Sequence, residues 1–326
     1  MEYMFEKGMI SVIIPVYNAS AFIRQCLDSL LRQTYKNWQA ILIDDGSIDS
    51  SYSICQEYSK GDDRFQVISK KNEGVSKTRN LALDLCKGEF VFFLDADDFL
   101  LDENCFDRLI FEMAKEEIDL VRFDYQAVDE KSNTIFINGN IKLRKKYYSR
   151  SLSISDYCIH VAMDEYFLAM NLLRNNIIQE FHIRFVEGCR MREDAAFLLT
   201  YLANSRQVIY LPYICYAYRK HSGAATAISS IKIYSKDLSM VFDALISLLK
   251  KNTNKDYISY LEFFLSNIVV DLRGTEFFKQ RYNLCKKFKN KSLRYYCLKL
   301  ACFTNISLSI LNFLSHCFNK IKRIIA

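Results

Sequence analysis

The run Phe90-Val-Phe-Phe-Leu-Asp-Ala-Asp-Asp98 places five consecutive apolar residues directly before three carboxylates. A short continuous apolar run is typical of a strand that is buried on both faces of a sheet. Crowded carboxylates repel one another unless a cation or hydrogen-bond donors neutralise them. Hard divalent ions do this, and they also take phosphate oxygens of a substrate. The run therefore predicts a metal site at a strand end; a turn or helix cap is the alternative, with Asp98 the best candidate for a cap.

Strand-like runs and helical spacing alternate around this segment over the first 125 residues. The apolar runs lie at 10–15, 40–43, 65–68, 90–94 and 120–123. Helical spacing lies between them, at about 22–31, 51–58 and 75–86. The third helix is expected to end in a left-handed cap at Gly88. Buried strands separated by helices predict an α/β fold with a mostly parallel sheet.

The pattern changes after about residue 125. Helical spacing returns at about 154–178 and 192–203, and strand-like runs occur at 208–211 and 213–218. Residues after 231 have helical spacing to the end of the chain. We therefore expect one domain over 1–230, with halves at about 1–125 and 126–230, and a helical, basic C-terminal region over 231–326.

The composition is that of a folded protein with reduced cysteines. Half of the 326 residues are hydrophobic and only two are proline. The 11 cysteines are scattered singly, without a CxxC pair or zinc-type spacing to the 4 histidines, which is typical of a reducing compartment. No apolar stretch has the length of a signal peptide or a membrane span, so we expect a cytoplasmic protein.

Charge is distributed unevenly along the chain. The net charge is +6, although residues 277–326 contain 11 Lys or Arg and no acidic residue, so the preceding part is acidic. A basic segment favours an anionic surface, and its apolar residues Leu311, Phe313, Leu314 and Phe318 favour a membrane over nucleic acid. We therefore expect contact with the inner face of the cell membrane and no nucleic-acid partner; a solvated helix face is the alternative.

Polar residues gather where the predicted strands end. Tyr17-Asn18 follows the first strand, Asp44-Asp45 the second and Asn72-Glu-Gly74 the third, while the carboxylates of 95–98 follow the fourth. The carboxyl ends of parallel strands meet at one edge of the sheet, where open α/β sheets bind their ligands. We therefore expect a single site at this edge.

Three of these motifs have both a chemical and a structural interpretation. The Asp45 carboxylate can accept a hydrogen bond from a base or a ribose, or can belong to a turn that starts the next helix. Arg79 follows a glycine turn at a helix start, which suits phosphate, but a surface arginine has the same pattern. Glu193-Asp194 opens a helix and can supply a base, yet acidic residues are common in first helical turns.

The order of these motifs resembles that of the family 2 inverting glycosyltransferases. The similar segments span about residues 10 to 225 and are Ser11-Val-Ile-Ile-Pro-Val-Tyr-Asn18, Ile43-Asp-Asp-Gly-Ser47, Asn72-Glu-Gly-Val-Ser76 with Arg79-Asn80, Leu94-Asp-Ala-Asp-Asp98, Ile183-Arg-Phe-Val-Glu-Gly188 with Arg192-Glu-Asp194, and Tyr216 to Ser222. The resemblance is closest to bacterial enzymes that build capsule, exopolysaccharide or lipopolysaccharide. It implies a GT-A fold and sugar transfer from a nucleotide-diphosphate donor, with UDP expected, to a glycan or lipid-linked acceptor.

The resemblance implies donor-binding roles for several residues. Pro15 and Asn72 would belong to the nucleotide-sugar site. Tyr17 would lie against the base, and Asp45 would accept a hydrogen bond from it. Arg79 would help to order the diphosphate side.

The resemblance also implies the residues of the reaction. Asp95 would meet the ribose or the metal, and Asp97 would bind Mn²⁺ or Mg²⁺. Asp194 would be the general base that takes the proton of the acceptor hydroxyl. Arg219 and His221 would close over the diphosphate. One displacement would invert the configuration at the anomeric carbon.

Two other classes of protein fit part of the sequence. A nicotinamide-dependent oxidoreductase needs a glycine-rich turn after its first strand, and Pro15-Val-Tyr-Asn-Ala-Ser20 contains no glycine. A non-catalytic relative, acting as a scaffold in a polysaccharide assembly complex, is the second alternative. Loss of Asp97 or Asp194 would favour it, and both residues are present.

Overall fold

The computed structural model describes residues 4–115, 118–137, 147–162, 168–222, 234–251, 254–272 and 275–285. The chain divides into two units, Met1–Ser229 and Ser230–Ala326. Within the described ranges, no helix combines the length and the apolar character needed to cross a bilayer.

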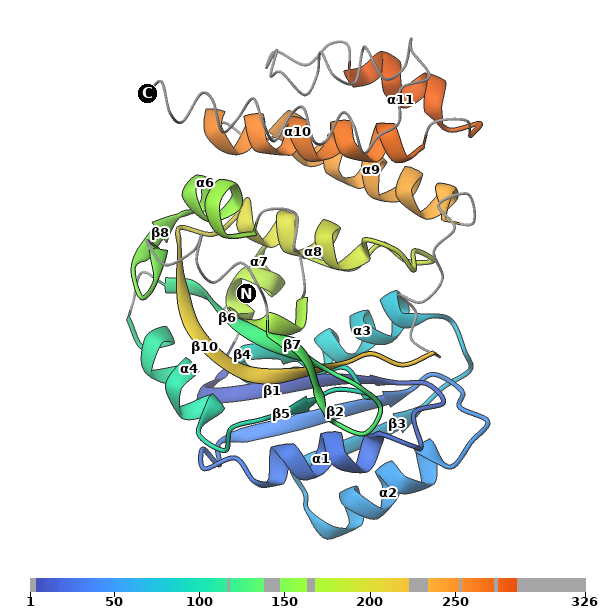
Figure 1. Cartoon of the computed structure of the whole chain (residues 1–326), viewed down its shortest axis with the longest axis vertical. Coiled ribbons are helices and arrows are strands. Elements are labelled where there is room, and N and C mark those ends of the chain that lie inside the picture. The colour runs from blue at the N-terminus through green and yellow to red at the C-terminus, as the bar shows by residue number, and fades with distance from the viewer. Residues whose placement is uncertain are drawn as a thin grey trace. The chain divides into compact units, whose positions relative to one another are not determined.

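One mixed sheet organises the described part of the first unit (Figure 1). Its order is β3-β2-β1-β4-β9-β6-β10-β5, with β7 paired to β6 and β8 to β10. The strands are β1 (Glu6–Val16), β2 (Trp38–Asp44), β3 (Phe65–Ser69), β4 (Gly88–Phe93), β5 (Phe99–Leu100), β6 (Ile118–Val128), β7 (Thr134–Ile137), β8 (Ser151–Ser153), β9 (Asn171–Arg174) and β10 (Gln207–Arg219). The pairs β1–β2, β1–β4, β2–β3 and β6–β10 are parallel. The predicted α/β fold and its five sequence-derived strands are confirmed.

Helices cover both faces of this sheet (Figure 1). One face carries α1 (Ile23–Leu31), α2 (Ser51–Gly61) and α4 (Cys105–Met113), and the other carries α3 (Val75–Asp84), α7 (Asn175–Glu180) and α8 (Glu193–Leu202). Short helical segments, α6 (Ile154–Asp156), η2 (Tyr157–Ala162) and η3 (Leu168–Met170), lie between β8 and β9. Coverage on both faces explains the apolar runs, because Val12 and Ile13 point to opposite faces and are both fully buried.

Gly88 does not cap α3, so the expectation of a left-handed cap there is wrong. The helix ends at Asp84 with Leu85 in a right-handed conformation, and Gly88 begins β4. A Cβ at Gly88 would lie 2.5 Å from the carbonyl oxygen of Met9 and 2.8 Å from the amide nitrogen of Ser11. The missing side chain therefore allows β4 to approach β1.

Two predictions for residues 154–218 are also wrong. The expected helix over 154–178 contains β9, which pairs antiparallel with β4 and β6 and is covered on both faces. The two strands expected at 208–211 and 213–218 form one strand, β10, that continues through Pro212. Proline is tolerated there because it is exposed and the register with β6 shifts between Tyr210 and Ile214.

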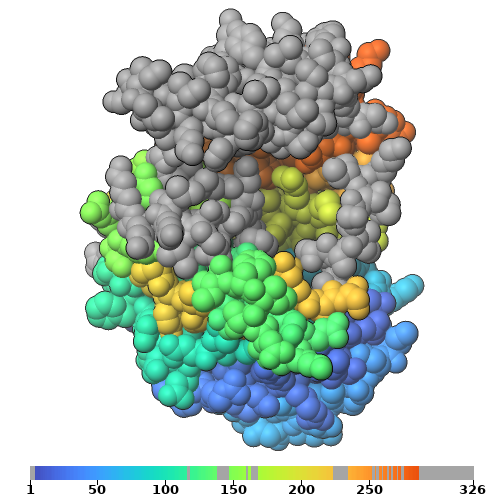
Figure 2. Space-filling model, in the orientation of Figure 1, coloured from blue at the N-terminus to red at the C-terminus, as the bar shows by residue number. Residues whose placement is uncertain are grey.

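Strand β7 is exposed along its whole length. It follows β6 through a hairpin and lies, in green, on the face shown in Figure 2. Its side chains Ile135, Phe136 and Ile137 are exposed, and the Lys220 ammonium lies 4.5 Å from the centre of the Phe136 ring.

Three helices form the described part of the second unit, namely α9 (Ser235–Lys251), α10 (Lys255–Asp271) and α11 (Phe278–Cys285). Helix α10 contacts both others. Helical structure expected after residue 231 is confirmed for these segments. The apolar and basic residues between 311 and 323, on which the membrane prediction depends, lie outside the described residues.

Candidate active site

The ends of β1, β2 and β4 meet at one edge of the sheet. In the parallel register, Val16 lies opposite Asp44, and Ile13 lies opposite Phe93. The amide N–H of Asp45 donates to the carbonyl of Val16 at 2.8 Å, so the two chains stay paired up to the loops. The residues that follow, including Tyr17, Asp45 and Asp95, therefore leave the sheet at the same edge, as expected from the sequence.

Tyr17 is presented on a loop that is tied to its neighbour. Its side chain is 53% exposed. The next residue, Asn18, has a left-handed φ of 48°. Its N–H donates to Ser47 Oγ at 3.0 Å, and its Oδ1 accepts from the N–H of Ile48 at 2.9 Å. An exposed ring on a fixed loop suits stacking against a planar ligand, and Pro15 lies just before it in β1.

Asp45 organises the turn that precedes α3. Its Oδ1 accepts from the N–H of Glu73 at 2.9 Å, and its Oδ2 accepts from the N–H of Gly74 at 2.8 Å. The ammonium of Lys70 also contacts Oδ1. Asp45 as a residue is 4% exposed, whereas Asn72 in the same turn is exposed. Asp45 therefore supports the loop beside which a base was expected to bind.

Arg79 connects two carboxylates that are distant in sequence. Its Nη1 donates to Glu193 Oε1 and its Nη2 donates to Asp95 Oδ1, both at 2.9 Å. The residue is 7% exposed, and its guanidinium carbon lies 5.4 Å from the centre of the Phe185 ring. Both terminal nitrogens of the side chain expected to face a diphosphate are thus engaged by carboxylates.

Other side chains of α3 hold the segment that leads into α8. Ser76 Oγ donates to the carbonyl of Cys189 at 2.6 Å. Asn80 Nδ2 donates to the carbonyl of Phe185 at 3.0 Å, and the Phe185 N–H returns a bond of 2.8 Å to Asn80 Oδ1. Sequence reasoning missed these two contacts, although Ser76 and Asn80 belong to the motif that it singled out.

Asp194 is a partly buried carboxyl in the first turn of α8. The preceding Arg192 adopts a left-handed φ of 60°, a strained conformation of the kind that gathers at functional sites. Burial, followed by the negative charge of Glu193, raises the pKa of Asp194 to about 7, against the opposing effects of the Ala195 N–H and Arg79. A carboxyl that exchanges its proton near neutral pH suits general base chemistry.

Asp97 lies beside His221 at the end of β10. His221 Nε2 and Asp97 Oδ2 are 2.8 Å apart, and the Asp97 side chain is 30% exposed. Burial, and then the charge of Asp95, raise the pKa of Asp97. Carboxylate oxygen suits Mn²⁺ and Mg²⁺, and imidazole nitrogen is a common metal ligand. Within the described ranges no group of three or more such side chains is assembled, so an ion here would also need oxygens from a substrate, as Mg²⁺ commonly does.

Asp98 is an anchor for β10 and does not cap a helix, which corrects its expected role. Its Oδ2 accepts from the Tyr216 hydroxyl and its Oδ1 from the Arg219 N–H, both at 2.7 Å. Burial raises the pKa of this carboxyl well above its ordinary value. The next helix, α4, begins only at Cys105.

Arg219 connects four segments and is 1% exposed. Its Nε donates to the carbonyl of Asp97 at 2.8 Å, and its Nη2 donates to Gln25 Oε1 at 2.6 Å. Its Nη1 donates to the carbonyls of Asp129 and Glu130 at 3.2 and 2.9 Å. These bonds hold loops to one another, and closure of Arg219 over a diphosphate stays a prediction.

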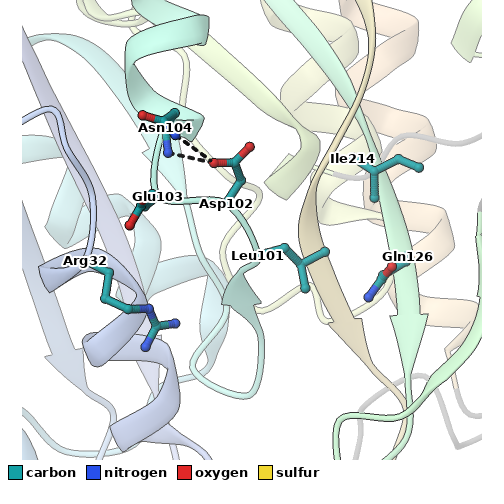
Figure 3. A pocket seen from close by; sticks show the side chains of 7 residues that line it. All are labelled: Arg32, Leu101, Asp102, Glu103, Asn104, Gln126 and Ile214. Carbon is teal, nitrogen blue, oxygen red and sulfur yellow. Dashed lines mark hydrogen bonds between the residues drawn. The ribbon is translucent and has the colours of Figure 1, made fainter.

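Two cavities differ in their relation to these side chains. The first, of about 660 Å³, includes His221 and is lined by Asp129, Glu130, Lys131, Asn133, Lys220, His221 and Ser222. The second, of about 550 Å³, is shown in Figure 3 and is lined by Arg32, Leu101, Asp102, Glu103, Asn104, Gln126 and Ile214. None of the residues of the second cavity was expected in the site, whereas the first adjoins the Asp97–His221 pair.

A family model and a curated relative match this chain. The model described as "Glycosyl transferase family 2" matches residues 11–175. Glycosyltransferase GlyG of Streptococcus pneumoniae serotype 4 (strain ATCC BAA-334 / TIGR4) is 27% identical over 249 residues, which are 73% of this chain and 80% of GlyG.

Solved structures share the fold. TarS 1-349 of S. aureus in complex with UDP has a TM-score of 0.60 at 18% identity and covers 79% of this chain and 71% of its own. The mannosyltransferase PcManGT from Pyrobaculum calidifontis, in complex with GDP-Man and Mn²⁺, has a TM-score of 0.55 at 12% identity, with coverages of 94% and 83%. These likenesses confirm the predicted GT-A fold.

The raised pKa of Asp194 makes stability depend on pH. The carboxyl keeps its proton to about pH 7 in the folded chain but only to its ordinary 3.8 in the unfolded chain. The folded state therefore binds more protons in that window, and the free energy of unfolding falls as the pH rises through it. Asparagine cannot ionise, so Asp194→Asn does not lose stability in this way. Relative to the wild type, its free energy of unfolding should therefore increase by about 1 kcal/mol or more between pH 4 and pH 8. Urea unfolding at several pH values measures the difference, and a constant difference would contradict the raised pKa.

Proposed function

The chain belongs to glycosyl transferase family 2, and we propose that it transfers a sugar from a UDP-sugar donor to a hydroxyl of a glycan or lipid-linked acceptor, with inversion. The observation that carries the proposal is the placement of Asp194, a carboxyl with a pKa of about 7, next to Glu193, which Arg79 ties to Asp95. This arrangement brings a candidate base to the same edge as the expected donor residues.

The donor side of the proposal uses the loops after β1, β2 and β3. Tyr17 stacks on the base, and Pro15 shapes the loop that presents it. Asp45 and Asn72 form the wall beside the base, since the Asp45 carboxylate orders the turn that contains Asn72. Asp95, with its side chain 37% exposed, meets the ribose.

The proposed metal site is formed by Asp97 together with His221. The Asp97 carboxylate is a ligand that suits Mn²⁺, imidazole is a common metal ligand, and the hydrogen bond of 2.8 Å between the two side chains places them side by side. The complex of PcManGT with Mn²⁺ supports the use of a divalent ion in this fold. Such an ion supplies positive charge against the diphosphate as it leaves.

Asp194 is the proposed general base. Its carboxylate takes the proton of the acceptor hydroxyl while the acceptor oxygen bonds to the anomeric carbon from the face opposite the diphosphate. The bond from that carbon to the diphosphate breaks, and UDP departs with the electron pair. A single displacement needs one base, in contrast to the carboxylate pair of glycoside hydrolases.

Surface polysaccharide assembly at the inner face of the cell membrane is the proposed setting. The motif order resembles bacterial enzymes of that kind, and residues 277–326 carry 11 basic and no acidic residues. Each Lys or Arg near an anionic leaflet contributes about 1 kcal/mol of binding. We expect the full chain to sediment with anionic liposomes at low salt and to be released at high salt. Equal sedimentation with neutral and anionic liposomes would contradict this contact.

The donor and metal are tested together by calorimetry. We expect UDP to bind with Mn²⁺ and to lose at least about 10-fold in affinity with EDTA or in Asp97→Asn, because the diphosphate charge is then uncompensated. A panel of nucleotide sugars, assayed for hydrolysis and transfer with Mn²⁺, identifies the donor. Equal UDP affinity with Mn²⁺ and with EDTA would contradict the metal role. UDP binding without turnover of any donor would support the scaffold alternative.

The base is tested by a pair of neighbouring variants. Asp194→Asn should keep UDP affinity but lose at least about 10²-fold in kcat, the range expected for removing a general base. Glu193→Gln should be milder, because it leaves the Asp194 carboxylate in place. In the wild type, kcat/KM should rise with pH through about 7 as Asp194 ionises. A larger loss in Glu193→Gln than in Asp194→Asn would assign the base to Glu193.

A further inference from the structure

Neither the packing of α3 nor donor binding fully explains why Arg79 pairs with two carboxylates. It is a buried cation in α3, and it meets Asp95 after β4 and Glu193 at the start of α8, each through one terminal nitrogen at 2.9 Å. The two carboxylates are separated by almost one hundred residues of sequence. A planar guanidinium can hold two such groups in fixed directions, which an ammonium cannot.

The bridge acts on the residue next to the proposed base. Glu193 and Asp194 are consecutive in the first turn of α8, so holding the Glu193 carboxylate also holds the backbone turn from which the Asp194 side chain extends. Arg192, immediately before them, has a left-handed φ, and the segment leading to it is held by Ser76 and Asn80 of the same helix as Arg79. Helix α3 thus sets both the approach and the start of α8.

We propose that Arg79 and Glu193 are positioning residues for sugar transfer, whose bridge fixes the Asp194 carboxylate relative to Asp95 on the donor side. This inference rests on the proposed function and deepens it. Arg79 then acts through Asp95 and Glu193 rather than on the diphosphate. One side chain thus fixes the position of the base that deprotonates the acceptor relative to the residue that places the donor.

The residues of the bridge also change the pKa of Asp194 through their charges. Among the described residues, the charged groups with the largest effect on it are Glu193 on its own helix, Arg79 on α3 and Asp95 after β4. Glu193 and Asp95 raise its pKa, while Arg79 lowers it. Removing the charge of Glu193 while keeping its hydrogen-bond acceptor should therefore lower the pKa of Asp194 and leave the bridge in place.

Kinetics and UDP binding of two variants test the proposal, with Glu180→Gln as the matched control because Glu180 is exposed at the end of α7. Arg79→Lys keeps the charge but cannot hold both carboxylates. We expect it to lose about 10- to 100-fold in kcat, the scale of a misplaced reacting group, with UDP affinity in Mn²⁺ within about threefold of the wild type. A loss of UDP affinity of more than about 10-fold with unchanged kcat would make Arg79 a diphosphate ligand and overturn the proposal.

The second variant, Glu193→Gln, is tested by its pH dependence, which a purely structural role of Glu193 would leave unchanged. In Glu193→Gln the pH at which kcat/KM begins to rise should shift to lower pH, and Glu180→Gln should leave it unchanged. The pH window in which the free energy of unfolding falls should shift in the same direction, and urea unfolding measures this without turnover. A failure of wild-type transfer with every donor would refute the proposed function alone. An unshifted unfolding window in Glu193→Gln would refute the charge effect of Glu193 on Asp194, and an unchanged kcat in Arg79→Lys would refute the positioning role of the bridge.

Discussion

Repulsion among carboxylates is the constraint on which this site depends. Asp95, Asp97 and Asp98 follow one buried strand, and Arg79 brings Glu193 and Asp194 to the same edge. Among the described residues, the groups that compensate this charge include Arg79, His221, the N–H groups of Arg219 and Ala195, and the hydroxyl of Tyr216. The repulsion that remains is relieved in two ways: a cation is proposed to bind at Asp97, and Asp194 stays protonated, and therefore uncharged, to about pH 7.

Most residues of the sequence motifs form hydrogen bonds that hold loops to one another. Asp45 accepts two backbone N–H groups of the turn before α3, and Ser76 and Asn80 bind the segment before α8. Arg219 does the same for the hairpin after β6. A ligand-binding edge made of loops needs such bonds, because loops lack the regular pairing of the strands beneath them.

The sequence was sufficient to predict the structure where the deciding pattern is local. The run from Phe90 to Leu94 predicted a buried strand, and the alternation around it predicted the α/β fold. Strand β9 escaped prediction because a short apolar run is compatible with helix or strand, and the choice depended on the gap between β4 and β6. The contacts of Arg79 with Glu193 and of Asp98 with Arg219 were equally inaccessible, since these partners are 114 and 121 positions apart in the sequence.

The late position of β9 in the chain has a consequence for biosynthesis. Chains fold as they emerge from the ribosome, starting from the N-terminus. Strands β1 to β4 are complete by Phe93, but the outer edge of β4 gains its partner only when Asn171–Arg174 arrive. Until then the nascent chain presents an apolar strand edge, which is a template for pairing with another chain. The late arrival of β9 therefore lengthens the time in which the early strands can pair with another chain.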